Sequence, residues 1–145
     1  HQAHLAPVIK EYRVGTYIYN DRSLLVRGAC GLDDCALHVL ATVISTPTPE
    51  RAIIDAGSKI LTTDLFGLGG HGVIIGHPLL AVSALSEEHG NIDCSRAPGS
   101  LAVGDRIRVV PNHACVVSNM VDQVYLMDDG KVFSVEAVAA RGMVV

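Results

Sequence analysis

The pattern of hydrophobic and polar positions predicts a chain built mostly of β-strands. The segment EYRVGTYIYND (11–21) alternates at its centre and ends in an Asn-Asp turn signal. CALHVLATVIST (35–46) is a longer apolar run that stops before two prolines, and RAIIDAG (51–57) is a short run that breaks at glycine. GDRIRVVPNHACVVSN (104–119) opens with a Gly-Asp turn and then reads as a further strand.

The clearest turn signal lies near the end of the sequence, where Asp129-Gly130 separates two β-rich arms. This dipeptide is typical of a two-residue type I′ hairpin. Helix signals are weak by comparison. SKILTTDL (58–65) predicts one or two helical turns, and HPLLAVSALSEEHG (77–90) has a helical length, but its AVSAL part (81–85) favours a strand. We therefore expect a mainly β fold, a barrel or sandwich with few short helices.

Composition narrows the possible functions. The chain has 145 residues, which suits one domain, with 49% hydrophobic and only 18% charged residues. This high apolar content favours a domain with an exposed apolar surface that contacts another domain or subunit. A net charge of −4, no basic cluster and 4% aromatic residues argue against nucleic-acid binding. The apolar runs are too short to cross a membrane, and no secretory signal is visible.

The cysteines and the chain start give further expectations. Four cysteines occur without a C-x-x-C pair, which is typical of reduced thiols in a cytoplasmic protein. The sequence begins with His1 rather than Met, which suggests a fragment or a processed product. We expect residues 1–10 to form a leader or linker and residues 11–145 to form the domain.

A glycine-rich stretch resembles a nucleotide-binding motif without its context. GLGGHG (67–72) spells G-x-G-x-x-G, but it leads into VIIGHP (73–78), which does not favour a helix start. Because that motif needs a helix N-terminus for the pyrophosphate, a surface or interface loop is the better interpretation.

The residues with the most chemical interest are His113 and Cys115. On a strand they would project from one face with Cα atoms about 6.5–7 Å apart, close enough for nitrogen and sulfur to meet one zinc ion. Two ligands alone are few, because catalytic zinc sites usually have three protein ligands. Two packed core residues are the alternative.

A second polar cluster, SEEHG (86–90), places Glu88 beside His89. These side chains are candidates for acid–base catalysis or for a third ligand, and a solvated turn is the alternative. Lys59, in DAGSK (55–59), is interpreted as a surface lysine rather than a Schiff-base lysine.

Several motifs in order resemble the C-terminal domain of the D-threonine aldolase and D-serine dehydratase family, alanine-racemase-like pyridoxal-phosphate enzymes of fold type III. The motifs are EYRVGTYIYND (11–21), AIIDAGSK (52–59), SEEHG (86–90), VGDRIRVVPNHAC (103–115) and ARG (140–142). The resemblance implies a largely β-structured domain beside a (β/α)8 barrel that holds pyridoxal phosphate on a lysine. It also implies that His113 and Cys115 bind a divalent metal near that cofactor.

The resemblance further implies a mechanism and partners. The metal would act as a Lewis acid on the β-hydroxyl of a D-amino acid, with Glu88 or His89 positioning substrate or a ligand. In this family a cysteine ligand is typical of zinc, whereas an aspartate in that position is typical of manganese or magnesium.

No barrel fits upstream of Glu11, so we expect the chain to need a barrel domain or chain, to form a homodimer, and to be inactive alone. A free-standing, non-catalytic β-barrel binding or assembly module is the alternative function.

Overall fold

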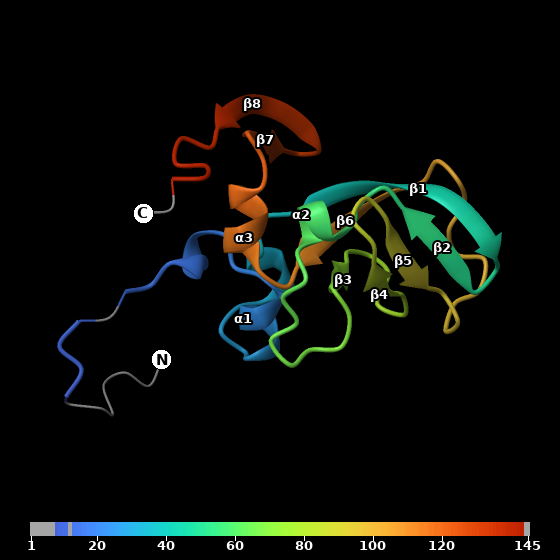
Figure 1. The fold of residues 1–145 in the computed structure, drawn as a ribbon, viewed down its shortest axis with the longest axis horizontal. Helices are drawn as coiled ribbons and strands as arrows, with labels where there is room; N and C mark the ends of the chain where they lie inside the picture. The colour runs from blue at the N-terminus through green and yellow to red at the C-terminus, as the bar shows by residue number, and fades with distance from the viewer. Residues whose placement is uncertain (1–7, 12, 144–145) are drawn as a thin grey trace.

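A curved β-sheet dominates the computed structural model, which describes residues 8–11 and 13–143 (Figure 1). The helical elements are η2 (Thr16–Ile18), α1 (Arg22–Val26), η3 (Leu32–Asp34), α2 (Ser58–Leu61) and α3 (Ala114–Asn119). The strands are β1 (Val39–Thr48), β2 (Arg51–Ile54), β3 (Gly72–Ile74), β4 (Ala81–Leu85), β5 (Gly90–Asp93), β6 (Arg106–Pro111), β7 (Gln123–Asp128) and β8 (Lys131–Ala137). The predicted mainly β class with few short helices is confirmed.

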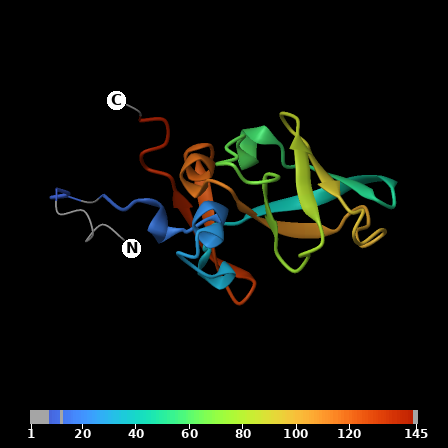
Figure 2. The ribbon, with the colours of Figure 1, turned by 90° about the horizontal axis from the view of Figure 1, so that it is seen from below.

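Six of the strands form a nearly closed antiparallel barrel, seen from two directions in Figures 1 and 2. The strand order is β3-β6-β1-β2-β5-β4, so β3 and β4 are the two edges. The backbone N–H of His71, just before β3, donates to the carbonyl of Val82 on β4 at 2.9 Å. This bond brings the two edges together and leaves little of either edge open to another chain.

Alternate residues of the barrel strands form the core. On β1 the inward positions Val39, Ala41 and Val43 are buried, and the residues between them are at least partly exposed. Ile54 of β2 and Ile92 of β5 are fully buried against them. The period-two pattern of the sequence therefore matches the inside and outside of the barrel.

The glycine-rich stretch is a loop that leads into a strand, as its sequence context predicted. Gly72 begins β3 with φ of 156°, a conformation that side chains disfavour. A Cβ placed there would lie 2.5 Å from Cγ1 of Val109 and 2.9 Å from the carbonyl oxygen of Val110. Glycine at this position allows β3 to approach β6.

The N-terminal part of the chain contradicts the strand predicted over residues 11–21. The structure places a 3-10 helix at Thr16–Ile18, where the Thr16 carbonyl accepts bonds from the N–H groups of Tyr19 and Asn20. Asn20 then adopts φ of 51° and turns the chain into α1. The prediction was wrong because alternation alone does not supply a neighbouring strand with which to pair. Most of the expected 1–10 leader, positions 1–7, lies outside the described residues.

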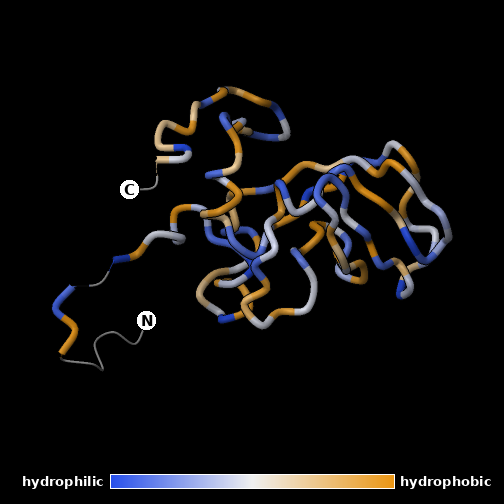
Figure 3. The backbone as a smooth tube through the Cα atoms, viewed as in Figure 1, coloured by the Kyte–Doolittle hydropathy of each residue, from blue (hydrophilic) through white to orange (hydrophobic). Residues whose placement is uncertain are grey.

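Strands β7 and β8 form the predicted hairpin. Asp129 and Gly130 have φ of 43° and 74°, the two positive values that a type I′ turn requires. The hairpin pairs only within itself and projects from the end of α3, away from the barrel (Figure 1). Figure 3 shows hydrophobic stretches along it, and Tyr125, Met127 and Phe133 are all more than half exposed.

Two weaker sequence interpretations are also confirmed. Residues 58–61 form the single helical turn α2, and residues 81–85 form the strand β4. In the part of the chain that the structure describes, every helix is too short or too polar to traverse a lipid bilayer.

Candidate functional site

The candidate metal ligands lie where β6 ends and α3 begins. His113 has extended backbone angles and is the N-cap residue of α3, and Cys115 is the second residue of that helix. The prediction that both residues lie on one strand is therefore wrong. Their side chains do not project from one face of a sheet. The orientation of each side chain depends on its own contacts.

A buried carboxylate explains why the chain turns helical here. Asp21 is fully buried, and its Oδ2 accepts a hydrogen bond of 3.0 Å from the backbone N–H of Ala114. Its Oδ1 accepts bonds from the Leu24 N–H at 3.2 Å and from the Ser23 hydroxyl at 2.7 Å. One carboxylate thus satisfies the first turn of α1 and the first turn of α3. This tertiary contact outweighs the β propensity of the sequence around Val116.

The side chain of Asn112 holds the end of β6 through a second set of hydrogen bonds. The side chain is 1% exposed, and its Nδ2 donates to the carbonyls of Asp64 and Gly70, each at 2.9 Å. Its Oδ1 accepts a bond of 3.1 Å from Nη1 of Arg22, which also donates to the Gly70 carbonyl at 3.1 Å. The segment between α2 and β3 is therefore tied to the residue that precedes His113.

The imidazole of His113 is held by Asp64. Nδ1 of His113 lies 2.6 Å from Oδ2 of Asp64, and the ring of Phe66 packs edge-on with centroids 5.0 Å apart. An Nδ1–H that donates to a carboxylate leaves the lone pair of a neutral imidazole on Nε2. Metal-binding histidines commonly have this arrangement, in which the carboxylate fixes both tautomer and ring orientation.

Cys115 has an exposed side chain on the first turn of α3. Its Sγ lies 3.3 Å from the hydroxyl oxygen of Thr16, in the N-terminal 3-10 helix. The segment that was predicted as a strand thus contributes a polar neighbour to the thiol.

The donor types of these two side chains are those of a zinc ligand pair. An oriented imidazole nitrogen and an exposed thiol are a donor set that suits zinc. Within residues 8–11 and 13–143, no group of three or more His, Cys, Asp or Glu side chains is arranged to hold a metal ion.

The second predicted cluster lies on an exposed turn between β4 and β5. Nζ of Lys59 contacts the carboxylates of Glu88 at 2.6 Å and Glu87 at 3.1 Å. The hydrogen bond from Lys59 lowers the pKa of Glu88, which favours the carboxylate over a proton-donating acid. Lys59 is on the surface, as expected. Within the described residues, no hydrogen bond or ion pair joins Glu88 or His89 to His113 or Cys115.

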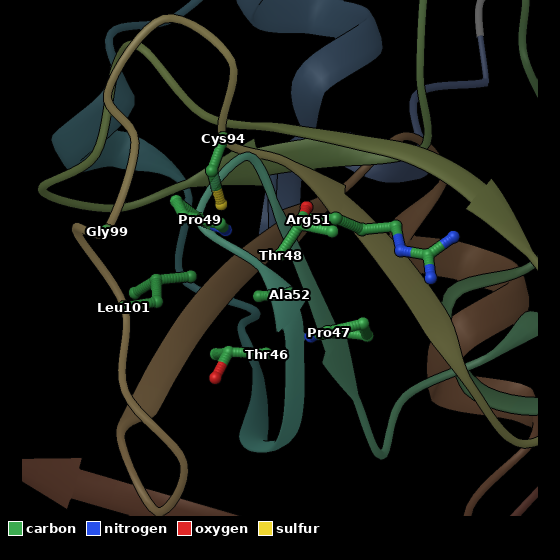
Figure 4. A pocket seen from close by; sticks show the side chains of 9 residues that line it. All are labelled: Thr46, Pro47, Thr48, Pro49, Arg51, Ala52, Cys94, Gly99 and Leu101. Carbon is green, nitrogen blue, oxygen red and sulfur yellow. The ribbon is translucent and has the colours of Figure 1, made fainter.

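A hollow at the opposite end of the barrel takes no part in this site. It lies beside the β1–β2 turn and contains Cys94, whose pKa is raised by burial (Figure 4). Arg51 is the charged residue in its lining, and its guanidinium extends away from the other labelled side chains (Figure 4).

Sequence reasoning missed three residues that shape the site. Asp21 was interpreted only as part of a turn, and Asp64 and Arg22 were not singled out. Asp64 precedes the glycine-rich loop, which is a weak local signal. Its contact with His113 spans 49 positions, and the Asp21–Ala114 contact spans 93, so neither follows from local pattern.

Comparisons with known proteins agree with this architecture. A family profile described as "Putative serine dehydratase domain" matches residues 36–127. An uncharacterized protein of Mycobacterium tuberculosis is 38% identical over 127 residues, which cover 84% of this chain and 96% of that protein. The D-threonine aldolase of an Arthrobacter species is 33% identical over 140 residues, which cover 93% of this chain and 35% of that enzyme.

The solved structure of D-threo-3-hydroxyaspartate dehydratase from Delftia sp. HT23 is 28% identical, with a TM-score of 0.72. It covers 86% of this chain and 38% of that enzyme. Structures of the same kind of enzyme include a histidine-to-alanine mutant and the metal-free form of a cysteine-to-alanine mutant. The two mutated positions lie two residues apart, the same separation as His113 and Cys115.

The chain thus spans nearly all of the mycobacterial relative but about a third of the named enzymes. The matched portions of the larger enzymes are their C-terminal domains, and these enzymes have the alanine-racemase-like architecture. With a profile match over more than half of its length, the chain belongs to the serine dehydratase domain family, the C-terminal domain of D-threonine aldolase and D-serine dehydratase type enzymes.

Proposed function

We propose that this domain supplies the metal ligands of a pyridoxal-phosphate-dependent lyase that acts on β-hydroxy-D-amino acids. His113 and Cys115 would bind one divalent metal, with zinc preferred over manganese or magnesium because the donors are nitrogen and sulfur. The observation that carries the proposal is the 2.6 Å contact between Asp64 and Nδ1 of His113, which presents Nε2 as a ligand.

The separation of the two ligands supports the same assignment. In the D-threo-3-hydroxyaspartate dehydratase structures, a histidine and a cysteine two positions apart were each replaced by alanine, and one structure is of the cysteine mutant in its metal-free form. The shared separation, within a structural match over 86% of this chain, supports the proposal that His113 and Cys115 correspond to these two residues.

The chemistry divides between the metal and the protein side chains. When bound, the metal would act as a Lewis acid on the substrate β-hydroxyl, for either dehydration or aldol cleavage. Asp64 would keep the His113 ring in place and in one tautomer, and Asp21 would hold the start of α3, which carries Cys115. Glu88 and His89 remain predicted positioning groups, and Lys59 neutralises the carboxylate of Glu88.

The rest of the active site would come from a partner. The chain corresponds to 35–38% of the larger enzymes, and pyridoxal phosphate would be bound by a barrel domain or chain that contributes its lysine. The exposed apolar residues of the β7–β8 hairpin are suited to contact such a partner, or a second copy in a homodimer. Alone, the chain should not catalyse the reaction.

Zinc titration followed by elemental analysis tests the metal site. The unaltered chain should retain about one zinc per molecule after desalting, the content of a single site. His113→Ala and Cys115→Ala should each lose it. His77→Ala and Cys30→Ala are the matched controls, because they remove a histidine and a cysteine that have no assigned part in the metal site. Zinc that persists in the first two variants would contradict the assignment.

A second function is favoured by one comparison. The mycobacterial relative is matched over 96% of its length, so nearly all of that protein corresponds to this domain. The chain would then be a free-standing binding or assembly module without catalysis. In that case zinc should not bind specifically, and the His113→Ala and Cys115→Ala variants should behave like their controls in the same titration.

A further inference from the structure

A cavity on the barrel, separate from the candidate metal ligands, collects positive charge. It has a volume of about 260 Å³ and lies between α1 and the edge strands β3 and β4. In Figure 1, α1 and these two strands lie on the same, lower side of the molecule. The charged residues of its lining are Arg22, Arg96 and Asp93, which give one net positive charge when His77 is neutral.

Neither arginine is neutralised by an acidic partner. Among the described residues, the ion pairs involve other arginines and not Arg22 or Arg96. The carboxylate of Asp93 accepts a hydrogen bond of 2.8 Å from the N–H of Ser95, which lowers the pKa of Asp93. This carboxylate is thus engaged with its own turn rather than with a guanidinium.

Arg22 is fixed in place with hydrogen-bonding capacity to spare. Its Nη1 donates to the Gly70 carbonyl and to Asn112 Oδ1, both at 3.1 Å. A guanidinium has five N–H donors in a rigid fork, so the other donors of Arg22 remain for a further acceptor. Burial lowers the pKa of Arg22, as expected for a cation withdrawn from water without a counter-ion.

The positive charge of Arg22 also affects His71, which lies nearby. Nδ1 of His71 is buried and has no hydrogen-bond partner in the described part of the chain. Burial lowers the pKa of His71, and the positive charge of Arg22 lowers it further. The charge of Arg22 is thus felt at His71 without an ion pair that would neutralise it among the described residues.

We propose that this cavity binds a small oxyanion, a carboxylate or a phosphate, between Arg22 and Arg96. Planar guanidinium groups match the paired oxygens of such anions, and charge-assisted hydrogen bonds are the strong ones. Ile74, Leu79 and Leu80 form an apolar wall of the cavity, which suits the carbon chain of a short organic acid. The site is distinct from the metal ligands and does not depend on the proposed lyase function.

Titration of the ¹⁵N-labelled, chelator-treated chain with sodium propionate and with inorganic phosphate tests the site. Saturable chemical-shift changes should concentrate on the amides of residues 69–81. Saturation by propionate alone would identify an organic carboxylate, and saturation by phosphate alone would identify a phosphate group. Sodium chloride at equal ionic strength gives the reference for screening effects.

Arg96→Gln should weaken binding about tenfold, the effect of losing one hydrogen bond to a charged group. Arg96 is exposed and makes no side-chain hydrogen bond within the described residues, so this variant should fold. Arg106→Gln, an equal charge change at an exposed position outside the cavity, should leave binding unchanged. Equal effects of both variants, or shifts that follow ionic strength without saturation, would overturn the proposal. Because metal is absent throughout, the result does not depend on whether His113 and Cys115 bind zinc.

Discussion

At the residue scale, two aspartates that had no chemical role predicted from the sequence shape the candidate site. Asp64 orients His113, and Asp21 holds the backbone of Ala114. The sequence pointed to His113 and Cys115 through their residue types and spacing, because imidazole and thiol are strong ligand signals. It could not point to the aspartates, since a carboxylate is common in turns and its partner lies far along the chain.

Asp64→Asn should weaken zinc binding by about 10–100-fold, the usual effect of removing a carboxylate that orients a ligand histidine. The amide keeps the size of the side chain but not its charge. Competition with a chromogenic zinc chelator would give the dissociation constant, and Asp105→Asn would serve as the control at an exposed turn. An unchanged constant would show that the contact does not act on the metal site.

Asp21→Asn should lower the free energy of unfolding by about 2 kcal/mol, since a buried donor left without an acceptor costs about 1–3 kcal/mol. The carboxylate accepts three hydrogen bonds with two oxygens, and the amide has one oxygen to offer. Urea unfolding would measure the loss. Asp105→Asn, which alters an exposed acceptor of one backbone N–H, should cost clearly less.

At the element scale, the alternation of apolar residues and the identity of the turn residues predicted strands correctly. The strands β1, β2, β4 and β6, and the β7–β8 hairpin, all appear where apolar alternation and turn residues predicted them. The short strands β3 and β5 were not predicted, and the two false strand predictions, over residues 11–21 and beyond Pro111, share a cause. In both places β-forming residues have no strand beside them, and a side-chain or turn contact sets the backbone instead.

Gly72→Ala should destabilise the barrel more than Gly76→Ala. Both glycines have positive φ, but a Cβ at Gly72 would meet Val109 and Val110, whereas one at Gly76 would meet nothing within 4 Å. Chemical denaturation would compare the two variants, and the loss at Gly72 should exceed the loss at Gly76 because only Gly72 adds a steric clash to an unfavourable backbone conformation. Equal losses would mean that β3 shifts to accommodate the methyl group.

At the scale of the whole molecule, a barrel with closely apposed edges carries a hairpin that has no sheet of its own to join. A two-stranded hairpin is marginal in water, so its backbone should open more readily than that of the barrel. Hydrogen exchange should therefore show fast exchange over residues 123–137 and slow exchange over β1 and β6. Strong protection of the hairpin in a dilute sample, equal to that of the barrel, would contradict this expectation.

The contact between Asp21 and Ala114 also has a consequence for how the protein is made. The Cys115 thiol and the start of α3 are held in place only when residues 16–22 meet residues 114–115, a contact of very high sequence separation. During synthesis, residues 16–22 cannot make this contact until the residues that follow β6 have left the ribosome. A fragment that lacks either residues 16–22 or residues 114–115 should therefore lose the support that this contact gives to α3.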